Sequence, residues 1–516
     1  MPFGTILDPV FASPASMQIT GYTRCGDSAI WTGHYLAAEA FRYQATGSAD
    51  ALNNVKAAID GIRSLVDVTG TNLLARCLVP VNSPYATPLT QEESRHGVYT
   101  ANLQGTPYYW IGNTSRDQYS GVFFGLGVAH SMANEASVRA AISQLGTRML
   151  EFLLNHNWSV VMPNGGISTV FWIRPDQQLA LLQVGRLINA GRFGSTYETA
   201  RFFNASSVAN PIALEVLDDH NSYFKFNLDT INLYNLIRLE NSSYYEWWYR
   251  NAYNTLRRTT DGHGNAHFNM IDRGLNGANA ARDGETRALL DAWLTRPPRD
   301  DSIDLRGRYA SCGSPDRACA PIAVAERVRG DFLWQRSPFL LYGGDQGLIE
   351  GAGIDYILPY WMARHYGTIS GGNQPPAAVS VTPSSGSGQS QAFNFLISDP
   401  DGFQDVPFTL IVANPVLSAA SSCYMYFDRT ANAVYLANDP ATLWTGPVAL
   451  GSPGNLQNSQ CSVNTGASSS AGAANDLRLS LSLGFKTSGV KNLFIYAQDR
   501  TGANTGWQQK GVWTVP

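Results

Sequence analysis

The sequence predicts a two-domain protein, with an all-α domain followed by an all-β sandwich. The 516 residues exceed what one hydrophobic core usually supports. Apolar residues recur at helical spacing up to residue 367, whereas short alternating runs dominate after residue 391. Between these parts, residues 368–390 are rich in Gly, Ser and Pro, as linkers are. We therefore expect domains at 1–367 and 391–516, joined by a linker at 368–390.

Composition restricts the functions open to the chain. The hydrophobic fraction is 44% and the aromatic fraction 11%, which permits a large core and excludes global disorder. Charged residues make up only 15%, and the net charge is −4, so a nucleic-acid or polybasic membrane role is not expected. No apolar run approaches the roughly 20 residues of a membrane span. Residues 2–10 lack the charged and apolar segments of a signal peptide.

Six cysteines indicate an oxidising compartment. No two of them have the CxxC spacing of zinc or redox sites. We favour three disulfides between sequence neighbours, namely Cys25 with Cys77, Cys312 with Cys319, and Cys423 with Cys461. The protein would then be secreted or periplasmic, with its signal peptide already removed. Six buried free thiols are the alternative, because cysteine is readily buried.

Eleven helices are predicted in the first domain, and they come in pairs. Thr46-Gly47 and Thr69-Gly70 end the first two, and Pro175 begins the fifth. A hairpin with an Asn-Gly-Gly turn is expected at 158–173. The predicted helices cover residues 27–45, 49–68, 115–133, 135–155, 175–190, 195–204, 219–240, 242–259, 266–275, 280–294 and 352–366.

The odd-numbered helices differ from the even-numbered ones. Odd helices such as GVFFGLGVAH (121–130) and LALLQVGRLI (179–188) are apolar nearly all round, so they are expected to be buried on every side. Even helices such as NVKAAIDGIRSLVD (54–67) carry the charges. Six inner helices alternating with an outer ring form an (α/α)6 toroid. Over residues 20–367 this pattern resembles the six-hairpin glycosidase and polysaccharide-lyase superfamily, which implies a carbohydrate-active enzyme.

The second domain is expected to be a β-sandwich of short strands separated by Gly, Asn, Asp and Ser. The predicted strands are 393–397, 408–412, 423–427, 433–437, 477–483 and 492–497. The domain resembles the immunoglobulin-like accessory modules of secreted bacterial enzymes. Asp399, Asp401 and Asp405 surround a glycine turn, and clustered oxygens of this kind can bind structural Ca²⁺. A β-turn capped by Asp side chains explains the same residues, and no other cofactor is expected.

In a toroid, the loops that lead into the inner helices open onto one funnel. This chain places carboxylates, arginines, amides and aromatics at those positions, and sugar binding needs this mixture. We expect Glu350, held against apolar helix ends, to be the general acid, and Asp117 to be the base that activates water. Asp176, Asp27 and Asp355 are reserve catalytic candidates. The expected substrate-binding residues are Asp27, Trp31, Arg116, Tyr119, Arg174, His220, Asn221, Tyr223, Lys225, Arg336 and Asp355.

Each of these residues also has a purely structural explanation. A carboxylate in the first turn of a helix is favoured by the helix dipole by about 0.3–1 kcal/mol. Arg116 with Asp117, and Arg174 with Asp176, can be ion pairs that neutralise one another. Lys225 can extend its charged tip into solvent, and Trp31 and Tyr119 can be core residues.

Three functions are compatible with these residues. The first is a glycoside hydrolase that acts on a poly- or oligosaccharide, and we expect it to be a monomer. The second is a lyase of uronate-containing glycans, in which His220, Asn221, Tyr223 and Arg273 neutralise a carboxylate and move protons. The third is a non-catalytic glycan-binding surface protein. A metal hydrolase is not expected, because the eight histidines lack HExxH spacing.

Overall fold

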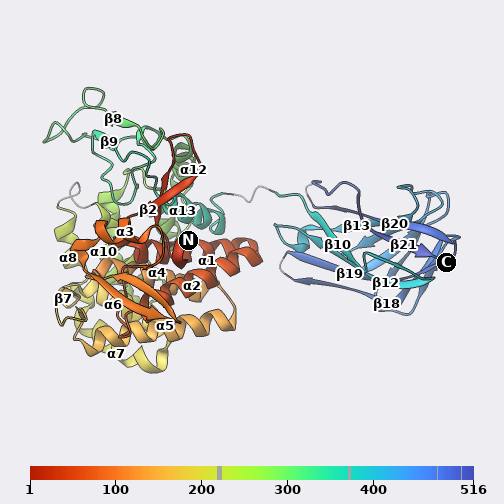
Figure 1. The fold of residues 1–516 in the computed structure, drawn as a ribbon, viewed down its shortest axis with the longest axis horizontal. Helices are drawn as coiled ribbons and strands as arrows, with labels where there is room; N and C mark the ends of the chain where they lie inside the picture. Colours follow the sequence, from red (N-terminus) through yellow and green to blue (C-terminus); the bar gives the residue numbers. More distant parts are fainter. Residues whose placement is uncertain (218–222, 370–372, 474, 501) are drawn as a thin grey trace. The chain divides into compact units, whose positions relative to one another are not determined.

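A computed structural model describes residues 1–217, 223–369, 373–473, 475–500 and 502–516. The chain forms two compact units (Figure 1). The first holds Met1–Ala45 and Asp50–Ser370, and the second holds Gly371–Pro516 with the short segment Thr46–Ala49. The first unit is mainly helical and the second consists of β-strands, as the sequence predicts.

All eleven predicted helices are present in the described residues, together with two short additional ones, α3 and α8. The helix expected at 195–204 begins five residues earlier, and the described part of the helix expected at 219–240 begins at Phe224. The helices are α1 (Ser28–Thr46), α2 (Ala49–Asp67), α3 (Ala86–Glu92), α4 (Arg116–Met132), α5 (Ala136–Asn155), α6 (Pro175–Ile188), α7 (Ala190–Asn204), α8 (Ala209–Glu215), α9 (Phe224–Arg238), α10 (Ser243–Thr260), α11 (Ala266–Asn276), α12 (Ala280–Leu294) and α13 (Ile354–His365).

The helices predicted to be buried all round form a connected set. In α4, every residue from 118 to 129 is buried, whereas α2 buries one face. Helix α4 packs against α6 and α9, α9 packs against α11, and α11 packs against α13. Helix α13 returns to α1, where the His365 ring lies 5.2 Å from the ring of Phe41. None of the helices in the described ranges combines the length and hydropathy that a membrane crossing requires.

Glycines bring α1 and α4 unusually close together. A Cβ atom on Gly33 would lie 2.1 Å from the carbonyl oxygen of Gly121, and one on Gly125 would lie 2.2 Å from the carbonyl oxygen of Gly33. No larger residue fits at these positions, so the backbones touch directly. This contact places the start of α1 beside the start of α4.

The helical unit also contains small antiparallel sheets. The hairpin predicted at 158–173 is one of them. It consists of β6 and β7. The strands of these sheets are β1 (Asp8–Phe11) with β2 (Ile19–Thr23), β3 (Cys77–Pro80) and β4 (Val98–Leu103) on either side of β5 (Thr106–Ile111), β6 (Ser159–Val161) with β7 (Ile167–Val170), and β8 (Ser302–Asp304) with β9 (Tyr342–Gly344).

The second unit contains two sheets that share one hydrophobic core, which is the arrangement of a β-sandwich. The five-stranded sheet contributes Phe395 and Leu479 to this core, and the seven-stranded sheet contributes Ile411 and Ile495. The five-stranded sheet has the order β10 (Ala377–Thr382), β12 (Ser390–Ser398), β19 (Asp476–Phe485), β18 (Cys461–Ala473), β17 (Asn455–Gln457). The seven-stranded sheet has the order β11 (Ser385–Ser387), β21 (Gln508–Val515), β20 (Gly489–Gln498), β13 (Phe408–Asn414), β14 (Cys423–Asp428), β15 (Ala433–Ala437), β16 (Trp444–Ala449).

All six predicted strands are present, but part of the predicted linker is also structured. Residues 377–387 form β10 and β11, which pair with β12 and β21. Alternation in the short run AAVSVT is the signal for a strand, and the surrounding Pro, Gly and Ser residues obscured it.

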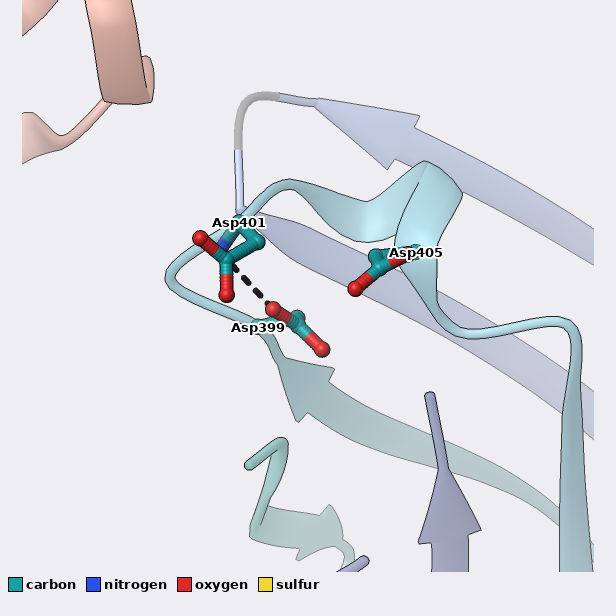
Figure 2. A group of neighbouring side chains, drawn as sticks. All are labelled: Asp399, Asp401 and Asp405. Carbon is teal, nitrogen blue, oxygen red and sulfur yellow. Dashed lines mark hydrogen bonds between the residues drawn. The ribbon is translucent and has the colours of Figure 1, made fainter. Parts of the chain in front are cut away.

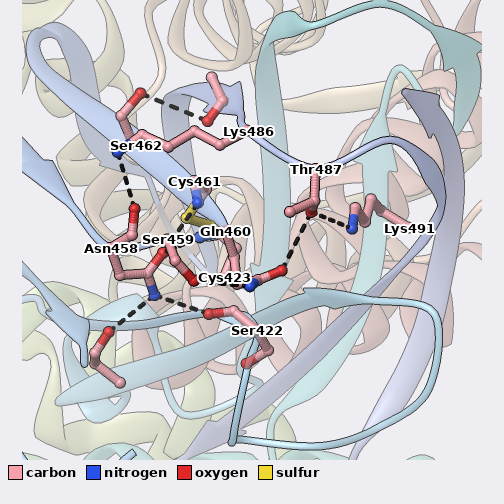
Figure 3. Close-up of a disulfide and its surroundings, with 12 residues drawn as sticks. Ser422, Cys423, Asn458, Ser459, Gln460, Cys461, Ser462, Lys486, Thr487 and Lys491 are labelled. Atoms are coloured by element: carbon pink, nitrogen blue, oxygen red, sulfur yellow. Dashed lines mark hydrogen bonds between the residues drawn. A yellow bond between two sulfur atoms is a disulfide. The ribbon is translucent and has the colours of Figure 1, made fainter. Parts of the chain in front are cut away.

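The three predicted disulfides are confirmed: Cys25–Cys77, Cys312–Cys319 and Cys423–Cys461. The last one joins β14 to β18 and therefore links the two sheets of the sandwich (Figure 3). Beside it, the Asn458 side-chain amide donates to the carbonyl oxygen of Ser422 at 2.9 Å.

Candidate functional site

Three chain segments meet at the carboxyl group of Asp27. This residue ends the short 3-10 turn Cys25–Asp27, directly before α1. Its Oδ1 accepts a hydrogen bond from Gln118 Nε2 in α4 at 3.2 Å, and its Oδ2 accepts one from Gln335 Nε2 at 2.8 Å. Gln335 belongs to the segment between β8 and β9, upstream of α13 in the sequence. The starts of α1 and α4 and this segment therefore converge at Asp27.

Asp117 lies beside Asp27 in the first turn of α4. Its Oδ1 accepts hydrogen bonds from the Gln118 N–H at 3.0 Å and from the Ser115 hydroxyl. Burial raises the pKa of Asp27, and the negative charge of Asp117 raises it further, while the hydrogen bond from Gln335 opposes the shift. The Asp27 side chain nevertheless remains 32% exposed. Two neighbouring carboxyl groups, one of which holds its proton to an elevated pH, can supply an acid and a base.

Arg76 holds the loops that carry Asp27 and Asp117, and it was not among the residues predicted from the sequence. Its Nη1 donates to the carbonyl oxygen of Gly26 at 2.8 Å, its Nη2 donates to Ser115 Oγ at 2.7 Å, and its Nε donates to the carbonyl oxygen of Asn113 at 3.0 Å. One guanidinium group thus fixes the loops before both α1 and α4. Arg76 follows α2 and stands at the start of no inner helix, so no pattern in the sequence marked it.

Arg174 organises a second, buried cluster that connects α6, α8 and α9. It forms ion pairs with Asp176 at 2.8 Å, Glu215 at 2.6 Å and Asp229 at 2.7 Å. Burial raises the pKa of Asp229 well above its usual range; the charge of Arg174 opposes this shift, and that of Glu215 adds to it. Asp176 is buried and both of its oxygens face Arg174. The cluster therefore ties three helices together, which is the structural explanation foreseen for Arg174 and Asp176.

Arg116 stands between the two groups of acids. Its Nη1 donates to the carbonyl oxygen of Val170 in β7 at 2.9 Å. Burial and the positive charge of Arg174 lower the pKa of Arg116, while the carboxylates of Asp176, Glu215 and Asp117 oppose that shift. Arg116 thus interacts electrostatically both with Asp117 at the start of α4 and with the buried cluster around Arg174.

A cavity of about 620 Å³ lies next to Gln335, the residue that holds Asp27. This volume is within the range of sites that bind small ligands. Within the lining, Arg336 pairs with Asp331 at 3.1 Å, and Arg24 donates to Gln346 Oε1 at 2.9 Å. The lining residues are Arg24, Tyr223, Gly330, Asp331, Phe332, Gln335, Arg336, Ser337, Leu340 and Gln346.

Two aromatic residues expected to bind substrate belong instead to the core. Trp31 is buried, with its ring 4.4 Å from that of Phe332, and it also packs on Trp334. Tyr119 is fully buried, and its hydroxyl accepts a hydrogen bond from the N–H of Leu74 at 3.2 Å. Both expectations are corrected here, because the side chains in the middle of the helical unit pack against one another.

Glu350 has a different environment from the one predicted. Its carboxylate forms an ion pair with the buried side chain of Arg299 at 3.1 Å. Asp355, in the first turn of α13, is buried; its Oδ2 accepts the N–H of Leu333 at 3.1 Å and lies 3.8 Å from Arg296. Burial raises the pKa of Asp355, and the charge of Arg296 opposes this. Asp355 therefore holds the loop that carries Gln335.

The remaining predicted residues are spread over the start of α9 and the cavity. Tyr223 lines the cavity, with its hydroxyl 3.5 Å from His263 Nδ1. Lys225 is half-buried in the first turn of α9, and Asp229, four residues further along this helix, pairs with Arg174. Arg273 lies in the last turn of α11, away from the helix starts, and donates to the carbonyl oxygen of Tyr366. The described residues do not include His220 and Asn221.

Comparisons with known proteins identify no family. No family model matches the chain, and no curated protein matches it. Among solved structures, endoglucanase CelQ from Clostridium thermocellum complexed with cellotriose aligns at a TM-score of 0.35 and 8% identity, covering 88% of this chain and 83% of that one. The same endoglucanase complexed with cellotetraose aligns at 0.34 and 10%, with the same coverage. At these values the likeness carries no argument about fold or activity.

Proposed function

We propose that the chain is a glycoside hydrolase that cleaves a poly- or oligosaccharide. One observation carries this proposal: Asp27 and Asp117 are partly accessible carboxyl groups at converging helix starts, they interact electrostatically, and the pKa of Asp27 is raised. The cavity beside Gln335 offers a place for sugar residues, with polar groups for hydroxyls and the rings of Phe332 and Tyr223 in its lining.

The proposed fold of the helical unit is an (α/α)6 toroid that forms the catalytic domain. Support comes from the series of contacts that leads from α4 through α6, α9, α11 and α13 back to α1. The β-sandwich would be an immunoglobulin-like accessory domain. Three disulfides favour a secreted or periplasmic location, and we expect a monomer.

In the proposed reaction, protonated Asp27 donates its proton to the glycosidic oxygen as the bond to the anomeric carbon breaks. Asp117 accepts a proton from the water that attacks the same carbon, so the products are two sugars with new hydroxyl groups. Arg336 and Tyr223, which line the cavity, would hold substrate there, and Arg116 and Lys225 remain proposed substrate-binding residues outside its lining. Glu350 is the general acid expected from the sequence. It is not the acid in this proposal, because its carboxylate forms an ion pair with Arg299.

The test is a screen against neutral and uronic-acid polysaccharides, read for new reducing ends and for ultraviolet-absorbing unsaturated products. Asp27→Asn and Asp117→Asn should each lower turnover at least about a hundredfold, the scale of lost acid–base catalysis. Glu350→Gln and the exposed control Asp60→Asn should stay near the wild-type rate. Unsaturated products would show that the enzyme works by elimination and not by hydrolysis. The absence of any product would favour the non-catalytic glycan-binding alternative.

A further inference from the structure

Three aspartates gather in the turn that follows β12, far along the chain from the proposed catalytic site. One carboxylate oxygen from each of Asp399, Asp401 and Asp405 lies within 4.8 Å of the other two (Figure 2). Figure 2 shows the three side chains on the same side of this turn, with Asp405 carried by the short 3-10 helix Phe403–Asp405. Gly402 has a φ of 103°, which an L-residue rarely adopts, and the turn depends on it.

Asp399 provides the observation that points to a ligand. It is fully buried, and its Oδ1 accepts the N–H of Asp401 at 2.8 Å. Its Oδ2 is also buried and has no hydrogen-bond partner. An ionised oxygen removed from water and left without a partner is strongly unfavourable unless a cation or a proton satisfies it.

A second buried oxygen next to the cluster is also unsatisfied. The main-chain oxygen of Asn475 accepts the N–H of Asp399 at 2.9 Å. The side-chain Oδ1 of Asn475 is buried without a hydrogen-bond partner. Amide oxygens are common calcium ligands.

The charges around the turn are not balanced. Asp405, Asp401 and Asp499 place three negative charges near Asp399, and Arg500 places one positive charge near Asp405. Within the described ranges, no ion pair joins Asp399, Asp401 or Asp405 to a lysine or arginine. Four carboxylates at one end of the sandwich therefore favour a bound cation.

We propose that Asp399, Asp401 and Asp405 bind one calcium ion, with Asp499 adding negative charge beside it. The three proposed ligands are carboxylates, and Ca²⁺ prefers oxygen ligands, whereas zinc and copper prefer histidine or cysteine. Ligands on a turn are adaptable, which suits Ca²⁺ better than the strict octahedral geometry of Mg²⁺. This inference does not depend on the proposed glycosidase activity.

The ion would also stabilise the position of Asn373 and Gln374 at the beginning of the β-sandwich unit. The N–H of Gln374 donates to Asp401 Oδ2 at 2.6 Å, and the side-chain amide of Asn373 donates to Asp499 Oδ2 at 2.7 Å. Calcium would hold these acceptors in place. We therefore expect Ca²⁺ to raise the thermal stability of the sandwich, because a ligand that binds only the folded state stabilises it.

The experiment is a calcium titration of the full chain by calorimetry after treatment with a chelator. We expect one Ca²⁺ per chain, affinity lowered at least tenfold in Asp401→Asn and in Asp405→Asn, and unchanged affinity in Asp439→Asn. Asp401 is exposed, so its replacement should leave the fold intact, and Asp439 is a matched aspartate in a turn elsewhere in the sandwich.

Thermal unfolding with and without Ca²⁺ is the second measurement. The sandwich transition should move to higher temperature with Ca²⁺ in the wild type and in Asp439→Asn, but not in Asp401→Asn. Absence of saturable calcium binding, full affinity in the Asp401 and Asp405 variants, or binding of Mg²⁺ as tight as that of Ca²⁺ would overturn the proposal.

Discussion

The Asp27 side chain contacts segments that are far apart in the sequence. Its carboxyl meets Gln118, 91 positions along the sequence, and Gln335, 308 positions along. The sequence placed Asp27 correctly at a helix start, but the partners that decide its pKa come from distant segments. For the same reason, Arg76 and Gln335 were not among the predicted site residues, and Trp31 and Tyr119 were assigned to substrate although they lie in the core.

The pH dependence of activity is the first prediction at this scale. An acid whose pKa is raised stays protonated at a higher pH than a free aspartic acid, so activity should fall as the pH rises through the pKa of Asp27. The measurement is kcat/KM against pH, on whichever polysaccharide is cleaved. The basic limb should move to higher pH in Gln118→Glu, because the added negative charge and the loss of the Gln118 donor raise the pKa of Asp27 further, and it should vanish with the activity in Asp27→Asn. An Asp27→Asn enzyme with the wild-type profile would contradict the assignment.

His34 leads to a prediction about stability. It is fully buried in α1, with Nδ1 2.8 Å from the carbonyl oxygen of Ile30 and Nε2 accepting from Asn227 at 3.2 Å. Burial lowers the pKa of His34 to about 4. The unfolded chain then binds more protons than the folded chain between pH 6.5 and 4, so the stability present above pH 6.5 is lost as the pH falls through that window.

The loss should amount to about 3 kcal/mol, since one pKa unit corresponds to about 1.4 kcal/mol. Denaturant unfolding of the wild type and of His34→Gln at pH 7 and pH 4 measures it, because the comparison cancels the titration of all other groups. The wild type should lose its advantage over the variant at the lower pH. An advantage that stays constant across this range would show that the His34 imidazole is not held neutral.

At the scale of elements, helix periodicity identified all eleven long helices, and it also separated buried helices from peripheral ones. The close approach of α1 and α4 could not be predicted. A glycine in a helix has no side chain, so the sequence does not indicate which helix packs against it. The strands β10 and β11 were missed because linker composition outweighed one short alternating run. Local pattern therefore determined which elements form, while contacts between elements required the structure.

Gly33 tests the helix contact directly. In Gly33→Ala the new methyl group would meet the Gly121 carbonyl, so we expect a loss of about 1–3 kcal/mol of unfolding free energy, typical of overpacking. Gly194→Ala in α7 is the matched control, because a methyl group there meets nothing within 4 Å. The control should be neutral or gain up to about 1 kcal/mol from helix propensity. Equal effects of the two substitutions would refute the close packing of α1 and α4.

At the scale of the whole molecule, composition and cysteine spacing predicted two units and three disulfides. Each unit has its own hydrophobic core, so we expect two unfolding transitions. Replacing Cys423 and Cys461 together by serine should lower the stability of the sandwich by about 2–4 kcal/mol and leave the helical transition in place. Scanning calorimetry distinguishes the two transitions; a shift of both by similar amounts would show that the units unfold as one.

A double-mutant cycle on Asp27 and Asp117 tests the central claim most directly. If the two carboxyl groups act together on one glycosidic bond, the variant that carries both Asp27→Asn and Asp117→Asn should be scarcely slower than the slower single variant, because residues that act as a unit are strongly non-additive. Turnover of both single variants near the wild-type rate, or losses that simply multiply in the double variant, would contradict a shared catalytic site at the starts of α1 and α4.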